Sequence, residues 1–142
     1  MRILVCGSRD WANGDLIWAT LDGWSLTSAR AGGDHSGRKV RNLIIIEGGQ
    51  RKWDKEGRFW KGADFHAGRW AKFFAAEHES YPADWSNHGK AAGPMRNQQM
   101  LEVCKPELVL AFTNDLSKSK GTRDMVLRAQ KAGTRVIVIG ER

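Results

Sequence analysis

The most constraining feature of this sequence is a series of short, unbroken apolar runs that alternate with segments of helical periodicity. The runs are Arg2–Cys6, Leu43–Glu47, Leu108–Phe112 and Val136–Ile139, with a weaker strand around Ser80. Strands that are apolar throughout are typical of a parallel sheet whose two faces are both covered. The alternation predicts an α/β fold: a three-layer, doubly wound, Rossmann-like domain with a mainly parallel five-stranded sheet and helices on both faces.

Amphipathic helices are expected between these strands. Asn13 is placed to cap the first helix, and an apolar face that includes Trp70 marks a second helix beginning near Ala63. Another helix is expected over Thr122–Ala132 and is ended by Gly133, a favoured residue after a helix C-terminus. We expect one domain over residues 1–142, with polar insertions at about 25–42 and 50–61.

Charge and composition narrow the class of protein. The net charge of +7 favours an anionic partner, either nucleic acid or a phosphorylated small molecule. No apolar run is long enough to span a bilayer, and the N-terminus has no signal-peptide pattern. We therefore expect a cytoplasmic protein that does not bind membranes.

Metal and common cofactor motifs are missing from the sequence. Cys6 and Cys104 each lie within an apolar element, which predicts buried free thiols, and the four histidines are scattered. Neither the Gly-x-Gly-x-x-Gly dinucleotide fingerprint nor a P-loop occurs. The sequence thus predicts no metal site and no cofactor, and it excludes a standard NAD domain and a P-loop NTPase.

The segment from His88 to Met100 is the strongest candidate for ligand binding. Gly93 followed by Pro94 predicts a helix start, because proline at the first helical position already has a helical φ. Arg96 and Asn97 would then lie in the first turn, where unpaired amides favour an anion. Lys90 lies just upstream. This block predicts a phosphate site, and the alternative is a capped helix with solvated charges.

Residues at one edge of the predicted sheet form the candidate site. In doubly wound sheets, ligands bind beyond the carboxyl ends of the strands. The candidate ligand-binding residues are Gly7, Ser8, Arg9, Gly48, Gly49, Asp64, Asp84, Lys90, Gly93, Arg96, Asn97, Gly121 and Thr122. The glycines let phosphate or ribose approach the backbone, or they serve turn geometry alone.

The charged candidates have alternatives too. The planar guanidinium of Arg96 suits phosphate oxygens, and its alternative is a salt bridge to Asp84 or Asp124. Asp64 and Asp124 are expected to cap helices, to bind ribose hydroxyls or to activate water.

Seven short segments form an ordered pattern over almost the whole chain. They are Gly7–Trp11, Glu47–Gly49, Gly62–Asp64, Pro82–Trp85, Gly89–Met100, Leu110–Phe112 and Gly121–Met125. In this order they resemble the SLOG superfamily, the Rossmann-like group that joins the DNA-uptake protein DprA and the LOG nucleoside-monophosphate phosphoribohydrolases, and they are most similar to its YspA-like branch. The resemblance implies a nucleotide or nucleotide-derived ligand, such as an ADP-ribose-like molecule, in a sensor or sequestering protein, and a homo-oligomer.

The resemblance also raises an enzymatic alternative. A LOG-like enzyme would use Arg96 to hold the 5′-phosphate and a carboxylate, with Asp124 as the candidate, to assist attack of water on the ribose. Here Met125 stands where the LOG motif has its glutamate, and residues 50–61 separate two segments that are close together in relatives. The sequence therefore favours binding without turnover over hydrolysis.

The insertion at residues 50–61 suggests a third possibility. Trp53 and Trp60 lie among five basic residues, a composition that suits base stacking combined with phosphate contacts. The segment is interpreted as a lid over a nucleotide base, as a DprA-like contact for single-stranded nucleic acid, or as a solvated hairpin that its aromatic residues anchor. Trp18 and Trp70, in contrast, are expected in the core.

Overall fold

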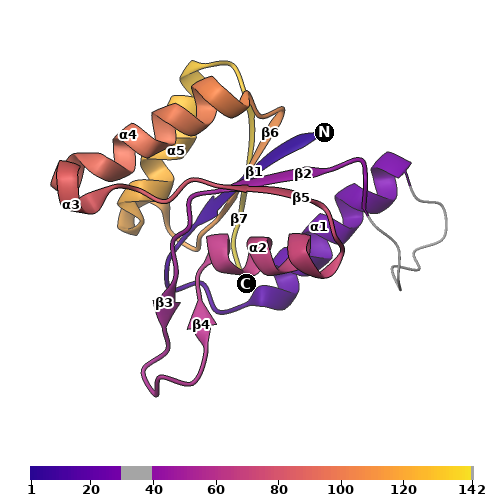
Figure 1. The fold of residues 1–142 in the computed structure, drawn as a ribbon, viewed down its shortest axis with the longest axis horizontal. Coiled ribbons are helices and arrows are strands. Elements are labelled where there is room, and N and C mark those ends of the chain that lie inside the picture. The colour runs from indigo at the N-terminus through magenta and orange to yellow at the C-terminus, as the bar shows by residue number, and fades with distance from the viewer. Residues whose placement is uncertain (30–39, 142) are drawn as a thin grey trace.

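The computed structural model describes residues 1–29 and 40–141, with only the backbone of residues 26–29. Five parallel strands form its central sheet (Figure 1). The strands are β1 (Arg2–Gly7), β2 (Ile44–Glu47), β5 (Glu77–Ser80), β6 (Leu108–Phe112) and β7 (Arg135–Ile139), in the spatial order β5-β2-β1-β6-β7. The chain moves outward from β1 to β5 and then returns to β6 on the other side of β1. This reversal creates a topological switch point between β1 and β6.

Helices cover both faces of the sheet, which confirms the predicted three-layer fold. On one face, α1 (Gly14–Ala29) and α2 (Ala63–Phe73) pack over the sheet. On the other face lie α4 (Ala92–Gln99), which continues into a π-helical turn over Met100–Cys104, and α5 (Lys120–Lys131). A short helix α3 (Trp85–His88) and 3₁₀ turns at Gly89–Ala91 and Leu116–Lys118 connect these elements.

Alternation along β1 builds the two halves of the core. Ile3 and Val5 point toward α1 and α2, whereas Leu4 and Cys6 point toward α4 and α5. All four side chains are buried, which explains why the strand is apolar throughout. Trp70 is fully buried on α2, as predicted, and its indole N–H donates a hydrogen bond to Asp22 at 2.9 Å.

Other predictions of local structure also hold. The Asn13 side chain accepts a hydrogen bond from the Leu16 amide at 3.1 Å, so Asn13 caps α1 as expected. Cys6 and Cys104 are buried free thiols. Trp18 packs against the core from a partly buried position. Within the described ranges, no helix combines the length and apolar character needed to cross a membrane.

The helix predicted at Gly93-Pro94 is present as α4, but it begins two residues earlier than predicted. After α3, whose C-cap residue Gly89 has a φ of 54°, a 3₁₀ turn leads directly into α4, so that α4 begins at Ala92 and Pro94 is its third residue. Proline is tolerated there because the first amides of a helix have no intrahelical acceptor. The Ala92 amide donates to the Gly89 carbonyl, and Arg96 falls in the second turn. Arg96 therefore lies outside the first turn, where it was predicted.

The two predicted insertions have different structures. α1 continues to Ala29, so the beginning of the 25–42 segment is helical, and Ser25 is fully buried. The part from 30 to 39 lies outside the described residues. Residues 50–61 contain a two-stranded antiparallel hairpin of β3 (Lys52–Trp53) and β4 (Trp60–Lys61), which projects below the sheet in Figure 1.

Candidate functional site

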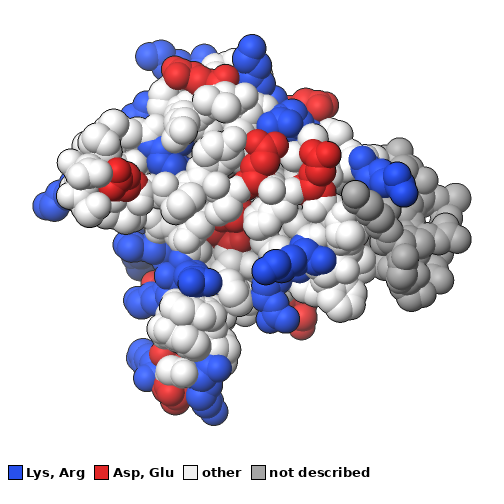
Figure 2. Space-filling model, in the orientation of Figure 1, with Lys and Arg blue, Asp and Glu red and all other residues white. Residues whose placement is uncertain are grey.

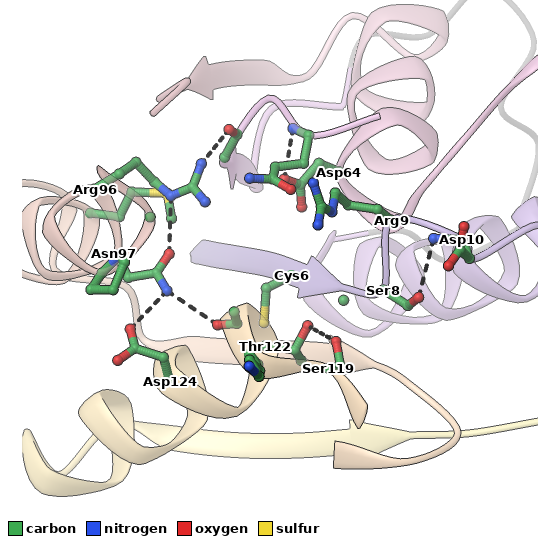
Figure 3. Close-up of a pocket in the computed structure, with 18 of the residues that line it drawn as sticks. Cys6, Ser8, Arg9, Asp10, Asp64, Arg96, Asn97, Ser119, Thr122 and Asp124 are labelled. Atoms are coloured by element: carbon green, nitrogen blue, oxygen red, sulfur yellow. Dashed lines mark hydrogen bonds between the residues drawn. The ribbon is translucent and has the colours of Figure 1, made fainter. Parts of the chain in front are cut away.

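A cavity of about 610 Å³ opens at the carboxyl ends of the strands, beside the switch point between β1 and β6 (Figure 3). The predicted site residues that line it are Gly7, Ser8, Arg9, Gly48, Asp64, Lys90, Gly93, Arg96, Asn97, Gly121, Thr122 and Asp124. They come from segments that lie far apart in the sequence. The topology of the sheet therefore brings most of the predicted site together at one edge.

Two predicted site residues do not line the cavity. Asp84 caps α3, where its carboxylate accepts hydrogen bonds from the Asn87 amide at 3.3 Å and from the Ser86 hydroxyl at 3.0 Å. Gly49 has a φ of 72°, a backbone conformation that favours glycine, in the turn after β2. The structure gives both residues a role in shaping the loops around the cavity.

The cavity also contains residues that were not among the predicted site residues. They are Cys6, Asp10, Gln50, Trp85, Pro94, Met100, Lys118, Ser119 and Lys120. A signal was present for Lys118 and Lys120, because they immediately precede the helix start at Gly121-Thr122. Met100 ends the segment predicted to bind a ligand, whereas Gln50 carries no such signal, since only the path of the chain after β2 brings it to the cavity.

Arg96 lies at the cavity wall with most of its hydrogen-bonding capacity already used. It is buried, with 8% of its surface exposed. Its Nε donates to the Asn97 side chain at 3.0 Å, and its Nη1 donates to the carbonyls of Gly48 and of Tyr81, the latter at 3.2 Å. The alternative for Arg96, an ion pair with Asp84 or Asp124, is not formed. Among the described residues, no acceptor is bonded to Nη2 of Arg96, and this atom is not fully buried.

Gly48 makes this position of Arg96 possible. A Cβ atom built on Gly48 would overlap the Arg96 guanidinium and would lie 3.1 Å from the Asp64 carboxylate. The absence of a side chain thus lets a cation and a carboxylate approach the strand end from two sides.

Asn97 ties α4 to α5 across the cavity wall. Its side-chain amide donates to the Gly121 carbonyl at 3.2 Å and to the Asp124 carboxylate at 3.0 Å (Figure 3). Asp124 also accepts a hydrogen bond from Arg128 Nε at 2.8 Å. These contacts hold the Asp124 carboxylate in place, within an ion pair one turn apart on the same helix.

Asp64 is the cavity carboxyl group whose pKa is strongly raised by its surroundings. It is buried near the start of α2, and its Oδ2 accepts a hydrogen bond from the Gln50 amide at 3.0 Å. Burial and the nearby charge of Glu47 raise the pKa of Asp64 to about 7, although the Gln50 amide and Arg96 act in the opposite direction. The cavity therefore holds a carboxyl group that titrates near neutral pH.

This elevated pKa predicts a pH-dependent stability. Because folded Asp64 keeps a proton that the unfolded chain loses above about pH 4, its contribution to the free energy of unfolding should fall as pH rises toward 7. The expected slope is about 1.4 kcal/mol per pH unit. Urea unfolding at several pH values should show that Asp64→Asn removes this slope, whereas Asp15→Asn, at an exposed carboxylate, keeps the wild-type profile. Parallel profiles for wild type and Asp64→Asn would contradict this prediction.

The first turn of α5 has backbone amides that no side chain caps. Ser119 precedes the helix, and its hydroxyl donates to the Thr122 hydroxyl at 2.8 Å rather than capping a backbone amide. The first intrahelical bond is donated by Arg123 to Ser119, so the amides of Lys120, Gly121 and Thr122 precede it. These residues line the cavity. The helix dipole adds positive potential at this point.

Basic side chains surround this helix start. Lys118 and Lys120 flank it, and Arg9 reaches the cavity from the loop after β1. Of the acidic cavity residues, Asp10 is paired with Lys52 at 3.0 Å and Asp124 with Arg128. The electrostatics of the site therefore favour an anionic group beside the first turn of α5.

The β3–β4 hairpin lies beside the cavity and is anchored by its own aromatic residues. The rings of Trp53 and Trp60 stack with centroids 3.9 Å apart, and the Arg51 guanidinium lies 4.3 Å from the Trp60 ring. Lys52 and Lys61 both reach Asp10. Figure 2 shows basic side chains on the projecting hairpin, with acidic side chains among them. These contacts favour the anchored-hairpin interpretation, although Trp53 keeps 47% of its surface exposed.

Comparison with known proteins places the chain in one family. No protein-family model matches the sequence. The chain is 34% identical to the Gene 61 protein of Mycobacterium phage D29, over 146 aligned positions that cover 99% of this chain and 98% of the relative. The chain therefore belongs to the family of this Gene 61 protein.

Proposed function

We propose that this protein binds a nucleotide or nucleotide-derived ligand, either a nucleoside phosphate or an ADP-ribose-like molecule, and acts as a sensor or sequestering protein. The observation that carries the proposal is the uncapped first turn of α5, which lines the cavity together with Lys118 and Lys120. Backbone amides at a helix N-terminus, combined with flanking lysines, recognise phosphate oxygens. The order of the SLOG-like segments along the sequence supports a nucleotide as the source of that phosphate.

The remaining cavity residues suit the rest of such a ligand. Gly7 ends β1 at the cavity floor, where a side chain would occupy space. Asp64 supplies acceptor oxygens for ribose hydroxyls, and Arg96 presents its free Nη2. The cavity therefore combines donors for an anion with an acceptor for a sugar.

Affinity measurements with matched ligands and variants test the proposal. AMP and ADP-ribose should raise the melting temperature of the protein, whereas adenosine should not, because it lacks phosphate. Lys118→Ala/Lys120→Ala should weaken AMP binding at least tenfold, and Lys72→Ala/Lys131→Ala, which removes the same charge outside the cavity, should not. If no phosphorylated nucleotide binds, or if both double variants bind equally weakly, the proposal fails.

Hydrolysis of a nucleoside 5′-monophosphate is the second candidate function, as in the LOG enzymes. Two carboxyl groups, Asp64 and Asp124, line the same cavity as Arg96, which is the residue set that such a reaction requires. The hydrogen bonds from Asn97 and Arg128 to Asp124 favour a structural role for that carboxylate. Incubation with AMP decides between the candidates: release of adenine that is lost in Asp124→Ala supports hydrolysis, and intact AMP supports binding alone.

Salt dependence separates a pocketed nucleotide from a DprA-like complex with single-stranded nucleic acid along the β3–β4 hairpin. A nucleic-acid complex that neutralises many phosphates should weaken steeply between 50 and 200 mM salt, on the order of a thousandfold. A mononucleotide with one phosphate group in the cavity should weaken much less. We expect the shallow dependence, because Trp60 is already stacked on Trp53 and beside Arg51.

A further inference from the structure

We propose that Trp85 is the platform on which the base of the bound nucleotide stacks, at the end of the cavity away from the first turn of α5. This inference rests on the proposed nucleotide-binding function and assigns an orientation to the ligand. Trp85 lines the cavity and keeps 48% of its surface exposed. An indole that is half exposed on a cavity wall offers a planar apolar surface of the kind that nucleobases use for stacking.

The position of the Trp85 ring is fixed from one side. A Cβ atom built on Gly93 would lie 3.1 Å from Cη2 of Trp85, with Cζ3 and Cζ2 the next nearest atoms. The outer edge of the ring thus packs directly on the backbone of α4. At the other end of the residue, the α3 turn is closed by Asp84 and by the bond from the Gly89 amide to the Trp85 carbonyl. The ring is therefore held before a ligand arrives, which reduces the entropic cost of stacking.

Trp85 differs from the other exposed tryptophan in having no stacking partner. Trp53 is equally exposed, but its ring is stacked on Trp60. Across the residues that the structure describes, neither an aromatic ring nor a cation is stacked on Trp85. Its ring is free to accept a base.

The cavity wall connects Trp85 to the anion site through a short chain of contacts. Trp85 packs on Gly93, Asn97 follows Gly93 by one helical turn, and the Asn97 amide bonds to Gly121 in the first turn of α5. One turn of helix separates neighbouring side chains by about 6 Å, so the ring and the anion site are on the order of 10 Å apart. A nucleoside 5′-phosphate, with its base and phosphate at opposite ends of the ribose, fits this separation.

Lys90 is a further cation at the aromatic end of the cavity, which suits a larger ligand. It belongs to the 3₁₀ turn that directly follows α3. A second phosphate, as in a nucleoside diphosphate or a dinucleotide, would meet this ammonium group near the base platform. The main prediction concerns stacking of the base on Trp85. It is tested with two small ligands that differ only in the presence of the base.

The test compares AMP with ribose 5-phosphate, which has no base, by isothermal titration calorimetry. Wild-type protein should bind AMP about tenfold more tightly than ribose 5-phosphate, because stacking on an aromatic residue accounts for such a difference. Trp85→Ala should weaken AMP binding about tenfold and leave ribose 5-phosphate binding unchanged, so that the two ligands become equal. Trp85→Phe should keep most of the preference for AMP. Trp53→Ala, at the equally exposed tryptophan outside the cavity, should change neither affinity.

Retained binding of ribose 5-phosphate shows in the same experiment that Trp85→Ala is folded. Trp85→Leu keeps an apolar side chain but has no aromatic face, so it should show the same affinities as Trp85→Ala. The inference is overturned if Trp85→Ala and Trp85→Leu retain the wild-type preference for AMP, or if they weaken both ligands equally. Failure of the wild type to bind either ligand overturns the proposed function and this inference with it, and that result is distinguishable from failure of the base platform alone.

Discussion

Replacing Arg96 with alanine should lower the free energy of unfolding by about 3–5 kcal/mol at pH 8, the range for removing one partner of a buried charge cluster. The guanidinium is buried near Asp64 and Glu47 and donates to the carbonyls of Gly48 and Tyr81. Its loss removes the positive charge near the buried Asp64 and Glu47 carboxyl groups and leaves two carbonyls without this donor. Binding of AMP should be weakened as well, because the free Nη2 disappears from the cavity.

The loss should depend on pH in a defined direction. At pH 5, where Asp64 is protonated in the folded protein, the buried negative charge is smaller and Arg96→Ala should cost less than at pH 8. Urea denaturation at both pH values measures the difference. Arg128→Ala, which removes a partly exposed arginine from an ion pair with Asp124, is the matched control and should cost about 1 kcal/mol or less. Equal losses for the two arginine variants would show that Arg96 does not stabilise the site.

Replacing Gly7 with alanine should destabilise the protein by about 3 kcal/mol, at the upper end of the usual cost of overpacking. Gly7 pairs with Phe112 at the switch point between β1 and β6. An added Cβ would overlap the Phe112 carbonyl oxygen and lie 2.7 Å from Ala63 Cβ. Both neighbours are parts of the buried core and cannot move independently, so β1 and β6 would have to separate at the cavity floor.

The same substitution elsewhere provides the control for Gly7→Ala. Gly23 is exposed within α1, and a Cβ built on it meets no atom within 4 Å. Gly23→Ala should therefore stabilise the protein by up to about 1 kcal/mol, since alanine is the better helix former. Melting temperatures of the two variants should move in opposite directions. If Gly7→Ala melts at the wild-type temperature, the close contact at the switch point is not as described.

The sheet and the edge at which the cavity opens could be predicted because they depend on local patterns. Unbroken apolar strands require burial on both faces, and this requirement determines the layers before any contact is known. The spacing around Trp70 similarly predicted the buried face of α2. The sequence also predicted that most of the cavity-lining residues lie at one edge of the sheet, because the carboxyl ends of parallel strands meet at the same edge.

The start of α4 was predicted two residues too late because proline is a weak signal for the exact start of a helix. Pro94 fits both the first and the third helical position, and the 3₁₀ turn that leads into α4 at Ala92 decided between them. The start of α5 is uncapped because the Ser119 hydroxyl donates its hydrogen bond to the Thr122 hydroxyl, and the sequence does not predict this side-chain conformation. Trp85 was missed as a cavity residue for a similar reason, since its contact with Gly93 exists only once α3 and α4 are packed.

Titration of ¹⁵N-labelled protein with AMP, followed by NMR, tests the central claim most directly. We expect the largest shifts of the backbone amides at Lys120, Gly121 and Thr122, with smaller shifts at Ser8 and Arg9, and a shift of the Trp85 indole N–H. The amides of the β3–β4 hairpin should move little. Shifts confined to the hairpin, or no shifts at millimolar AMP, would contradict the claim that this cavity is a nucleotide-binding site.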